Sequence, residues 1–230
     1  MQLYRETCQC NLNDVWIGKN MENDNENQRS SYMVRITGYH GTCSSAQESI
    51  ERYGLDPART KNRPDHWLGQ GVYFFLQQDQ ARWWAEDIAG KNWNHGSVAL
   101  VYSADIVADQ KYVRDFREYE DVAQFQKWAV ELLNSLNEGD EAKPKFTTEK
   151  FRGLLFDYYK TEYNIYVMIG SFSKNRVGYA SYDPREEELR LQKAIMKTTG
   201  IYYQEVQVCV SNQACIQNQK VEYVGEVEVI

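Results

Sequence analysis

The chain has 230 residues, a formal net charge of −7 and an apolar fraction of 42%. This length can bury a substantial core, and the acidic balance argues against a protein that grips nucleic acid along its phosphate backbone. No run approaches the roughly 18 apolar residues that cross a bilayer, and no apolar signal core follows Met1, so the sequence predicts a cytoplasmic protein without a membrane span.

The first 30 residues differ in composition from the rest of the chain. Residues 20–31 are almost entirely polar and rich in Asn and Glu. Such a segment cannot bury enough apolar surface to offset its ordering entropy, which is typical of a linker. We therefore interpret 1–30 as an N-terminal extension with a polar linker, and 31–230 as one domain.

Strand and helix patterns alternate along the domain without the regular spacing of β-α-β units. Ser44 or Ser45 and Asp79 are candidate helix caps, and Gly54 is a candidate helix stop. The pattern predicts an α+β fold with a largely antiparallel or mixed sheet. In chain order, the predicted elements are a strand at 32–40, a helix at 44–54, a strand at 71–76, a helix at 79–88, a strand at 98–106, helices at 122–138 and 147–158, a strand at 164–172, a helix at 184–200, and strands at 205–210 and 221–230.

The cysteines and histidines do not form a metal-binding pattern. There are five Cys and three His, and the closest cysteines, Cys8 and Cys10, form a C-x-C pair with no C-x-x-C elsewhere. We predict reduced thiols and no metal. His66 and His95 lie in loops, where a solvated or hydrogen-bonded histidine is the usual finding.

Three segments interrupt apolar strands with polar or ring side chains beside glycines. They are residues 38–42 (Gly-Tyr-His-Gly-Thr), 68–75 (Leu-Gly-Gln-Gly-Val-Tyr-Phe-Phe) and 204–210 (Gln-Glu-Val-Gln-Val-Cys-Val). Glycine at such positions lets a ligand approach the backbone closely. Each segment thus delivers a candidate functional side chain from a strand.

This set resembles the ADP-ribosyltransferases, in particular the group whose three motifs centre on His, Tyr and Glu, as in the diphtheria-toxin and poly(ADP-ribose) polymerase families and bacterial relatives. The matching motifs are Tyr-His-Gly-Thr at 39–42, Gly-x-Gly-x-Tyr-Phe at 69–74 and a strand opened by Glu205. The resemblance covers about residues 33 to 216. It implies a split mixed or antiparallel β-sheet core with surrounding helices, and NAD as co-substrate with no metal.

The resemblance also implies roles for individual residues. Glu205 would stabilise the positive charge that builds on the ribose as the nicotinamide bond breaks. Tyr73 would stack on nicotinamide, with Trp83 or Trp84 of the following helix as its partner. His40 would bond a ribose hydroxyl of the adenosine half. The catalytic set is His40, Tyr73 and Glu205, and the cofactor-binding set is His40, Gly41, Thr42, Gly71, Tyr73, Gln80, Trp83 and Gln207.

Two of these positions depart from the family pattern. In the polymerases, a small hydroxyl residue just before the helix Ala holds the carboxamide of nicotinamide, and Gln80 occupies that position here. Many transferases place the catalytic Glu second in a pair of residues two apart, and the second residue here is Gln207. We assign the catalytic role to Glu205 because an acid opening the strand matches the His-Tyr-Glu group; with Gln207 as the true equivalent, transfer would be altered or lost.

The resulting hypothesis is a mono-ADP-ribosyltransferase that moves ADP-ribose from NAD to a macromolecular acceptor, protein or nucleic acid. The acidic balance favours protein. The resemblance implies a toxin, an effector or a phage-defence component, held by a neutralising antitoxin partner. Two alternatives stay open: an NAD glycohydrolase, in which water is the acceptor, and a degraded module that binds NAD or a partner without turnover.

Overall fold

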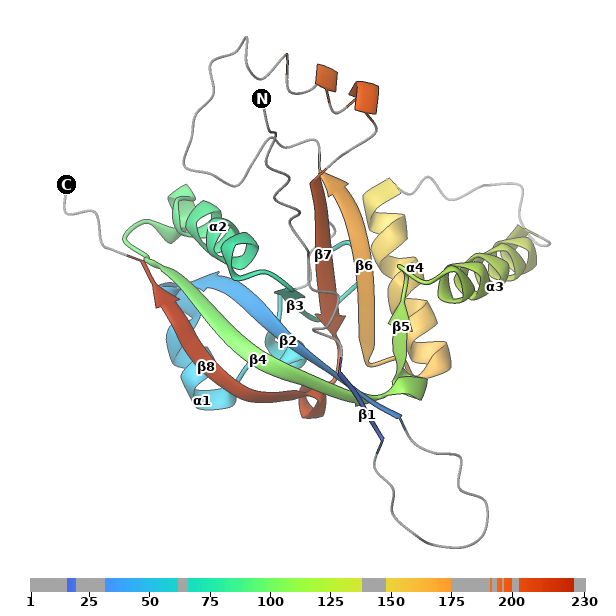
Figure 1. Ribbon diagram of the computed structural model, residues 1–230, viewed down its shortest axis with the longest axis horizontal. Helices are drawn as coiled ribbons and strands as arrows, with labels where there is room; N and C mark the ends of the chain where they lie inside the picture. Colours follow the sequence, from blue (N-terminus) through green and yellow to red (C-terminus); the bar gives the residue numbers. More distant parts are fainter. Residues whose placement is uncertain are drawn as a thin grey trace, which may run out of the picture.

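The computed structural model describes residues 16–19, 32–61, 66–137, 148–174, 191, 194–195, 197–199 and 203–225. Within these ranges the chain forms one mixed sheet of eight strands with helices packed against it, which confirms the α+β class (Figure 1). The strands are β1 (Trp16–Lys19), β2 (Tyr32–Cys43), β3 (Val72–Phe75), β4 (Ala99–Asp109), β5 (Val113–Asp115), β6 (Val167–Lys174), β7 (Tyr203–Val210) and β8 (Ile216–Val224). The helices are α1 (Gln47–Tyr53), α2 (Gln78–Ala89), α3 (Tyr119–Asn137) and α4 (Thr148–Tyr163).

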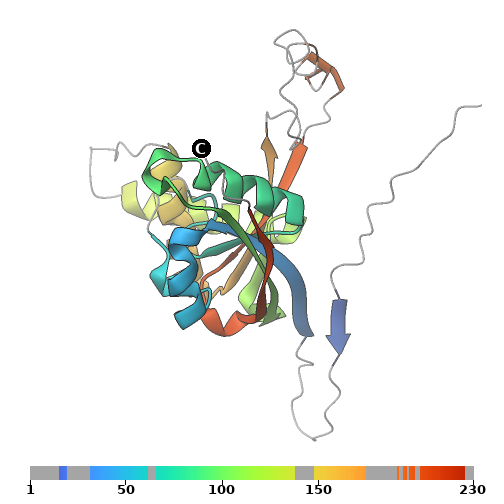
Figure 2. The same ribbon diagram turned by 90° about the vertical axis from the view of Figure 1, so that its left-hand side faces the viewer.

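The strand order is β5-β6-β7-β3-β2-β4-β8, with β1 pairing the first residues of β2 at the margin of the sheet (Figure 2). Among the described strand pairs, β5 and β6 run parallel and the others are antiparallel. β7, which comes late in the chain, lies inside the sheet between β6 and β3, and it pairs β3 over four residues.

The sheet has two halves that meet at one residue pair. β2 pairs β4 along eleven residues, from Met33 to Cys43. By contrast, β2 pairs β3 only where Tyr39 faces Phe75. The two strands separate on either side of this contact. The sheet is therefore split between β2 and β3, although these strands are neighbours in the strand order.

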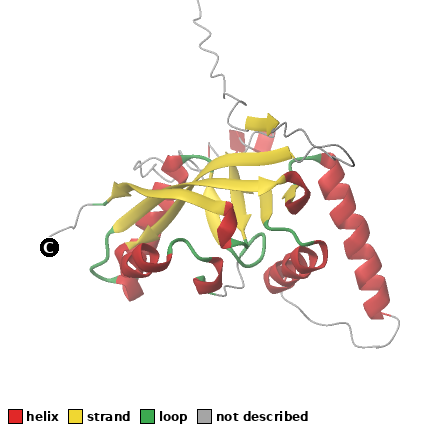
Figure 3. Ribbon diagram, turned by 90° about the horizontal axis from the view of Figure 1, so that it is seen from below, coloured by secondary structure: helices red, strands yellow, loops and turns green. Residues whose placement is uncertain are grey.

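Helices accompany each half of the sheet (Figures 1 and 3). α1 and α2 lie by β2 and β4, where Ala81 and Ala85 of α2 pack on Ala99 and Val101. α3 and α4 lie by β5, β6 and β7, where a second apolar cluster includes Trp128. A third and larger apolar cluster joins the two halves, since it contains Ile36 and Leu100 of one half and Val208 of the other.

The alternating pattern that predicts the first strand has the expected effect. Val34 and Ile36 are buried while Arg35 and Thr37 are exposed, because successive side chains of a strand point to opposite faces. This periodicity places the residues that follow, up to Cys43, in the centre of the molecule.

Several predicted boundaries are wrong for local reasons. A 3-10 turn at Ser44–Ala46 precedes α1, and neither serine caps the helix; the Ser44 hydroxyl instead accepts a bond from Val98 N at 3.0 Å. Helix α2 begins one residue before Asp79, which lies in its first turn. α4 continues to Tyr163, and Asn164 breaks it with a positive φ of 52°, so β6 starts at 167.

The last strand also differs from its predicted position. β8 begins at Ile216, directly after a 3-10 turn at Gln213–Cys215 that the Asn212 side chain caps. The short strands β1 and β5 were not predicted. Most of the predicted helix at 184–200, the loop at 139–145, residues 226–230 and most of the N-terminal extension lie outside the described residues.

Candidate active site

A cleft of about 460 Å³ opens where β2 and β3 separate. Its volume is in the usual range for small-molecule sites. Most of its lining area belongs to apolar atoms, with polar groups at a few positions. Of the predicted site residues, those that line it are His40, Gly41, Thr42, Gly71, Tyr73 and Gln207. The first two motifs and strand β7 thus come together at one site.

His40 links the two sides of the split. Its ring nitrogen Nδ1 lies 2.8 Å from the carbonyl oxygen of Tyr73. Since a carbonyl only accepts, Nδ1 carries the hydrogen. Burial lowers the pKa of His40 below its ordinary value of 6.5, against the smaller raising effect of that hydrogen bond. The ring is therefore neutral at pH 7, and Nε2 is left as an acceptor for a ligand hydroxyl.

Gly41 is required by the close approach of helix α2. A Cβ atom at this position would lie 2.1 Å from the carbonyl oxygen of Ala81. Any side chain would push α2 away from β2. The glycine therefore sets the distance between the helix and the strand that border the cleft.

Tyr73 is held at both ends of its side chain. Its hydroxyl accepts from Leu68 N at 2.7 Å and donates to Gly69 O at 2.7 Å. Burial raises the pKa of this phenol well above its usual range, so it stays protonated. The ring lies 4.9 Å from the ring of His66, centroid to centroid. Tyr73 thus offers a fixed aromatic face at the cleft.

Helix α2 places one tryptophan at the cleft and the other elsewhere. Trp84 lines the cleft and lies 6.5 Å from the ring of Phe75. Trp83, the residue assigned to the cofactor site, is not among the described lining residues. Gln80 is buried in the first turn of α2 and likewise does not line it. The assignments of Trp83 and Gln80 therefore lack support from the geometry, which favours Trp84.

Glu205 and Gln207 share one face of β7, as alternation predicts. Both are buried, and the Gln207 amide donates a short hydrogen bond to Glu205 Oε1. Only Gln207 lines the cleft, because it lies opposite Phe75, the last residue of β3. Glu205 faces Phe172 of β6 instead. The Glu205 carboxylate therefore holds the Gln207 amide through its nitrogen, and Gln207 is the member of the pair that lines the cleft.

Sequence reasoning missed several lining residues. Arg59 and Lys61 supply positive charge at the cleft, and Asp56 pairs with Arg59 at 3.5 Å. His66, expected to be an ordinary loop histidine, lies against Tyr73 at the lining, and its neighbour Trp67 also lines the cleft. Their position directly before the second glycine motif was the available signal.

The described residues contain no group of three or more potential metal ligands among His, Cys, Asp and Glu. Within the same part of the chain, no helix has the length and apolar character needed to span a membrane.

Comparison with known proteins gives one distant relative of note. Uncharacterized protein MJ0359 of Methanocaldococcus jannaschii is 25% identical over 201 residues, which cover 80% of this chain and 86% of that protein. No protein-family model and no solved structure matches the chain. The name of the relative describes no activity.

Proposed function

We propose that the protein is an ADP-ribosyltransferase that cleaves NAD in the cleft between β2 and β3 and transfers ADP-ribose to a macromolecular acceptor. The observation that carries the proposal is the His40–Tyr73 contact across the split sheet, beside Gly41. It brings the first two motifs of the resemblance into one cleft, although 33 residues separate them in the chain.

Each side chain at the cleft has a role in this reaction. The Tyr73 ring stacks on nicotinamide, with Trp84 available from α2. The backbone of Gly41, which lines the cleft, bonds the carboxamide, and His40 Nε2 accepts from a ribose hydroxyl. The bond between nicotinamide nitrogen and ribose C1′ breaks, and the electron pair leaves with nicotinamide. The acceptor then bonds C1′ and gives up a proton.

Positive charge on the ribose needs a nearby negative group in the transition state. Glu205 supplies that charge, and the Gln207 amide lies between it and the cleft. Through this amide, the carboxylate fixes an acceptor oxygen that faces the ribose hydroxyls. By analogy with the family, the setting is the cytoplasm, where the activity acts as a toxin or defence effector restrained by an antitoxin partner.

A second candidate is an NAD-binding module without transfer. The specific observation in its favour is that Gln207, and not Glu205, lines the cleft. A neutral amide recognises a hydroxyl but gives far less stabilisation to a cation than a carboxylate does.

Release of nicotinamide from NAD by the purified protein separates the candidates. The transferase releases nicotinamide, and Glu205→Ala lowers the rate by about a hundredfold or more. His40→Ala and Tyr73→Ala abolish release, while the exposed His95→Gln leaves it unchanged. NAD binding without release favours the module, and neither binding nor release contradicts both.

Labelled NAD and a whole-cell lysate then identify the acceptor class. Loss of label on protease treatment indicates a protein acceptor, and loss on nuclease treatment indicates a nucleic acid. Nicotinamide release without any labelled macromolecule indicates the glycohydrolase.

A further inference from the structure

The turn before β3, residues 68–71, decides where Tyr73 enters the cleft. The Tyr73 hydroxyl is bonded to the backbone of this turn at Leu68 and Gly69. Any shift of the turn therefore shifts the tyrosine ring. The orientation of the ring depends on whatever holds the turn in place.

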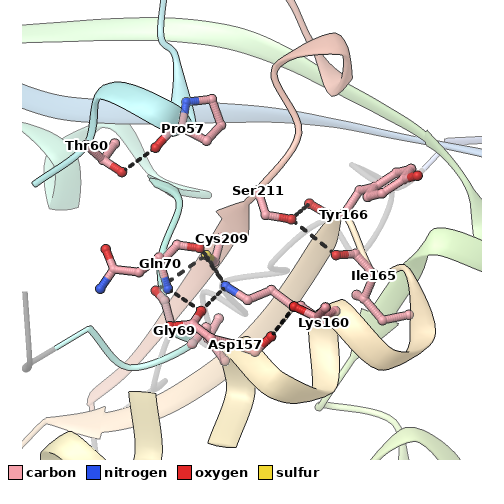
Figure 4. Close-up of polar contacts among 12 residues, drawn as sticks. Pro57, Thr60, Gly69, Gln70, Asp157, Lys160, Ile165, Tyr166, Cys209 and Ser211 are labelled. Carbon is pink, nitrogen blue, oxygen red and sulfur yellow. Dashed lines mark hydrogen bonds and ion pairs between the residues drawn. The ribbon is translucent and has the colours of Figure 1, made fainter. Parts of the chain in front are cut away.

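Two side chains of helix α4 hold the turn at Gln70 (Figure 4). Asp157 Oδ1 accepts from Gln70 N at 2.7 Å, and Lys160 Nζ donates to Gln70 O at 2.5 Å. The two side chains also pair with each other at 2.9 Å. Both backbone polar groups of one turn residue are thus bonded to one ion pair, one turn apart on the helix.

Lys160 differs from an ordinary surface lysine, whose ammonium group lies in water. Its side chain is only 7% exposed. Burying an ammonium group is costly unless it is paired and hydrogen-bonded. Here Asp157 supplies the charge and Gln70 the carbonyl, while Cys209 Sγ lies 4.0 Å away. This arrangement exists only when the turn is docked.

The docked turn separates two cavities. A second cavity of about 570 Å³ is lined by Gln70, Asp157 and Lys160, and it shares Gly71 with the cleft. The turn packs closely against Asp157 of α4: a Cβ at Gly69 would lie 2.2 Å from Asp157 Oδ1. Without the ion pair, the turn has empty space into which it can move, and Tyr73 would move with it.

We propose that Lys160 and Asp157 are positioning residues that fix the Tyr73 ring in the cleft by clamping Gln70. The part that concerns catalysis rests on the proposed function. The part that concerns Tyr73 itself does not, because the hydroxyl bonds of Tyr73 exist without ligand.

Hydrogen exchange at the Leu68 amide tests the clamp in the ligand-free protein. This amide bonds the Tyr73 hydroxyl and does not touch Lys160. Lys160→Met is expected to accelerate its exchange about tenfold or more by local opening. The matched control is Lys127→Met, which makes the same change on the exposed surface of α3. Unchanged Leu68 exchange in Lys160→Met overturns the proposal.

Asp157→Asn covers the case in which Lys160→Met does not fold. Asparagine keeps an oxygen for Gln70 N but removes the charge opposite Lys160. It is expected to accelerate Leu68 exchange less than Lys160→Met does, with the thermal unfolding midpoint nearer that of the original protein. No acceleration in a folded Asp157→Asn protein also overturns the proposal.

Kinetics of nicotinamide release test the catalytic part. Misplacement of Tyr73 by Lys160→Met is expected to lower kcat about a hundredfold, with a smaller change in KM. Tyr73→Phe removes the hydroxyl bonds, so adding Lys160→Met to it should cost little more. Full additivity of the two changes overturns action through Tyr73. If the original protein neither binds nor cleaves NAD, the proposed function fails, and the Leu68 exchange alone decides the clamp.

Discussion

His40 joins two properties in one side chain: it bridges the split sheet, and it presents a neutral acceptor to the cleft. Both follow from the bond to the Tyr73 carbonyl, which fixes the tautomer, and from burial, which lowers the pKa. A protonated imidazole would keep the first property and lose the second. The stability of the fold and the competence of the cleft therefore share a dependence on pH.

We predict that acid destabilises the fold partly through His40. Between about pH 6.5 and the lowered pKa of His40 in the folded state, the unfolded chain binds a proton at this histidine that the folded protein does not bind. The free energy of unfolding then falls with falling pH, by at most about 1.4 kcal/mol per pH unit for one group. Urea unfolding at pH 7.5 and 5.5 measures the loss, which should be smaller in His40→Gln.

The control for this experiment is His95→Gln, at an exposed histidine outside the cleft lining. It should keep the full pH dependence. An identical loss of stability in His40→Gln and in the original protein would contradict the assignment.

At the scale of elements, helix α2 matters because of how closely it packs on β2. The contact between Gly41 and the Ala81 carbonyl leaves no room for a side chain, and Ala85 of the same helix is fully buried. This docking fixes the rotation of the helix. Trp84 is thereby turned toward the cleft, and the adjacent Trp83 is not.

Substitution of the two tryptophans tests this rotation. Trp84→Ala should weaken NAD binding by about tenfold or more, since it removes a large aromatic contact of the kind worth 0.5–1.5 kcal/mol beyond its buried area, about 1.4 kcal/mol per tenfold. Trp83→Ala should change the affinity less than threefold, about the scatter of such measurements. Calorimetric titration with NAD measures both. The reverse order of effects would show that α2 presents the other face.

The tryptophans also show where sequence reasoning stops. Alternation in 32–38 correctly predicts the first strand. The glycine motifs predict that His40, Gly41, Gly71 and Tyr73 share a site, and all four line the cleft. Which tryptophan faces that cleft depends on the docking of α2 against β2, and no local pattern encodes it. The same holds for Glu205 and Gln207: alternation places both on one face, but only the pairing of Gln207 with Phe75 shows which one reaches the cleft.

For the molecule as a whole, three buried cysteines can be used to measure whether the domain is folded. Cys43, Cys209 and Cys215 are buried, and they come from β2, from β7 and from the turn before β8. Burial raises the pKa values of the Cys209 and Cys215 thiols, with Lys160 partly opposing this at Cys209. Thiolate, the reactive form, is thus scarce in the folded state.

We predict that these thiols react only when the whole domain opens. In a variant with Cys8→Ser and Cys10→Ser, a thiol reagent should label the native protein about a thousandfold or more slowly than the urea-unfolded chain. All three thiols should become reactive within the same transition. Mass spectrometry of labelled peptides checks this, and early labelling of one thiol would reveal a locally unstable half.

The position of β7 has a consequence for a chain that is still being made. β3 has a single pairing partner residue on β2 and four on β7, and β7 does not begin until Tyr203 of 230 residues. A nascent chain on the ribosome can therefore pair β2 with β4 early, but β3, the strand that carries Tyr73, still lacks its partner β7. Translation products that stop before residue 207 lack Gln207. If the activity is harmful to the cell that makes it, this order of synthesis keeps every fragment shorter than about nine-tenths of the protein inert.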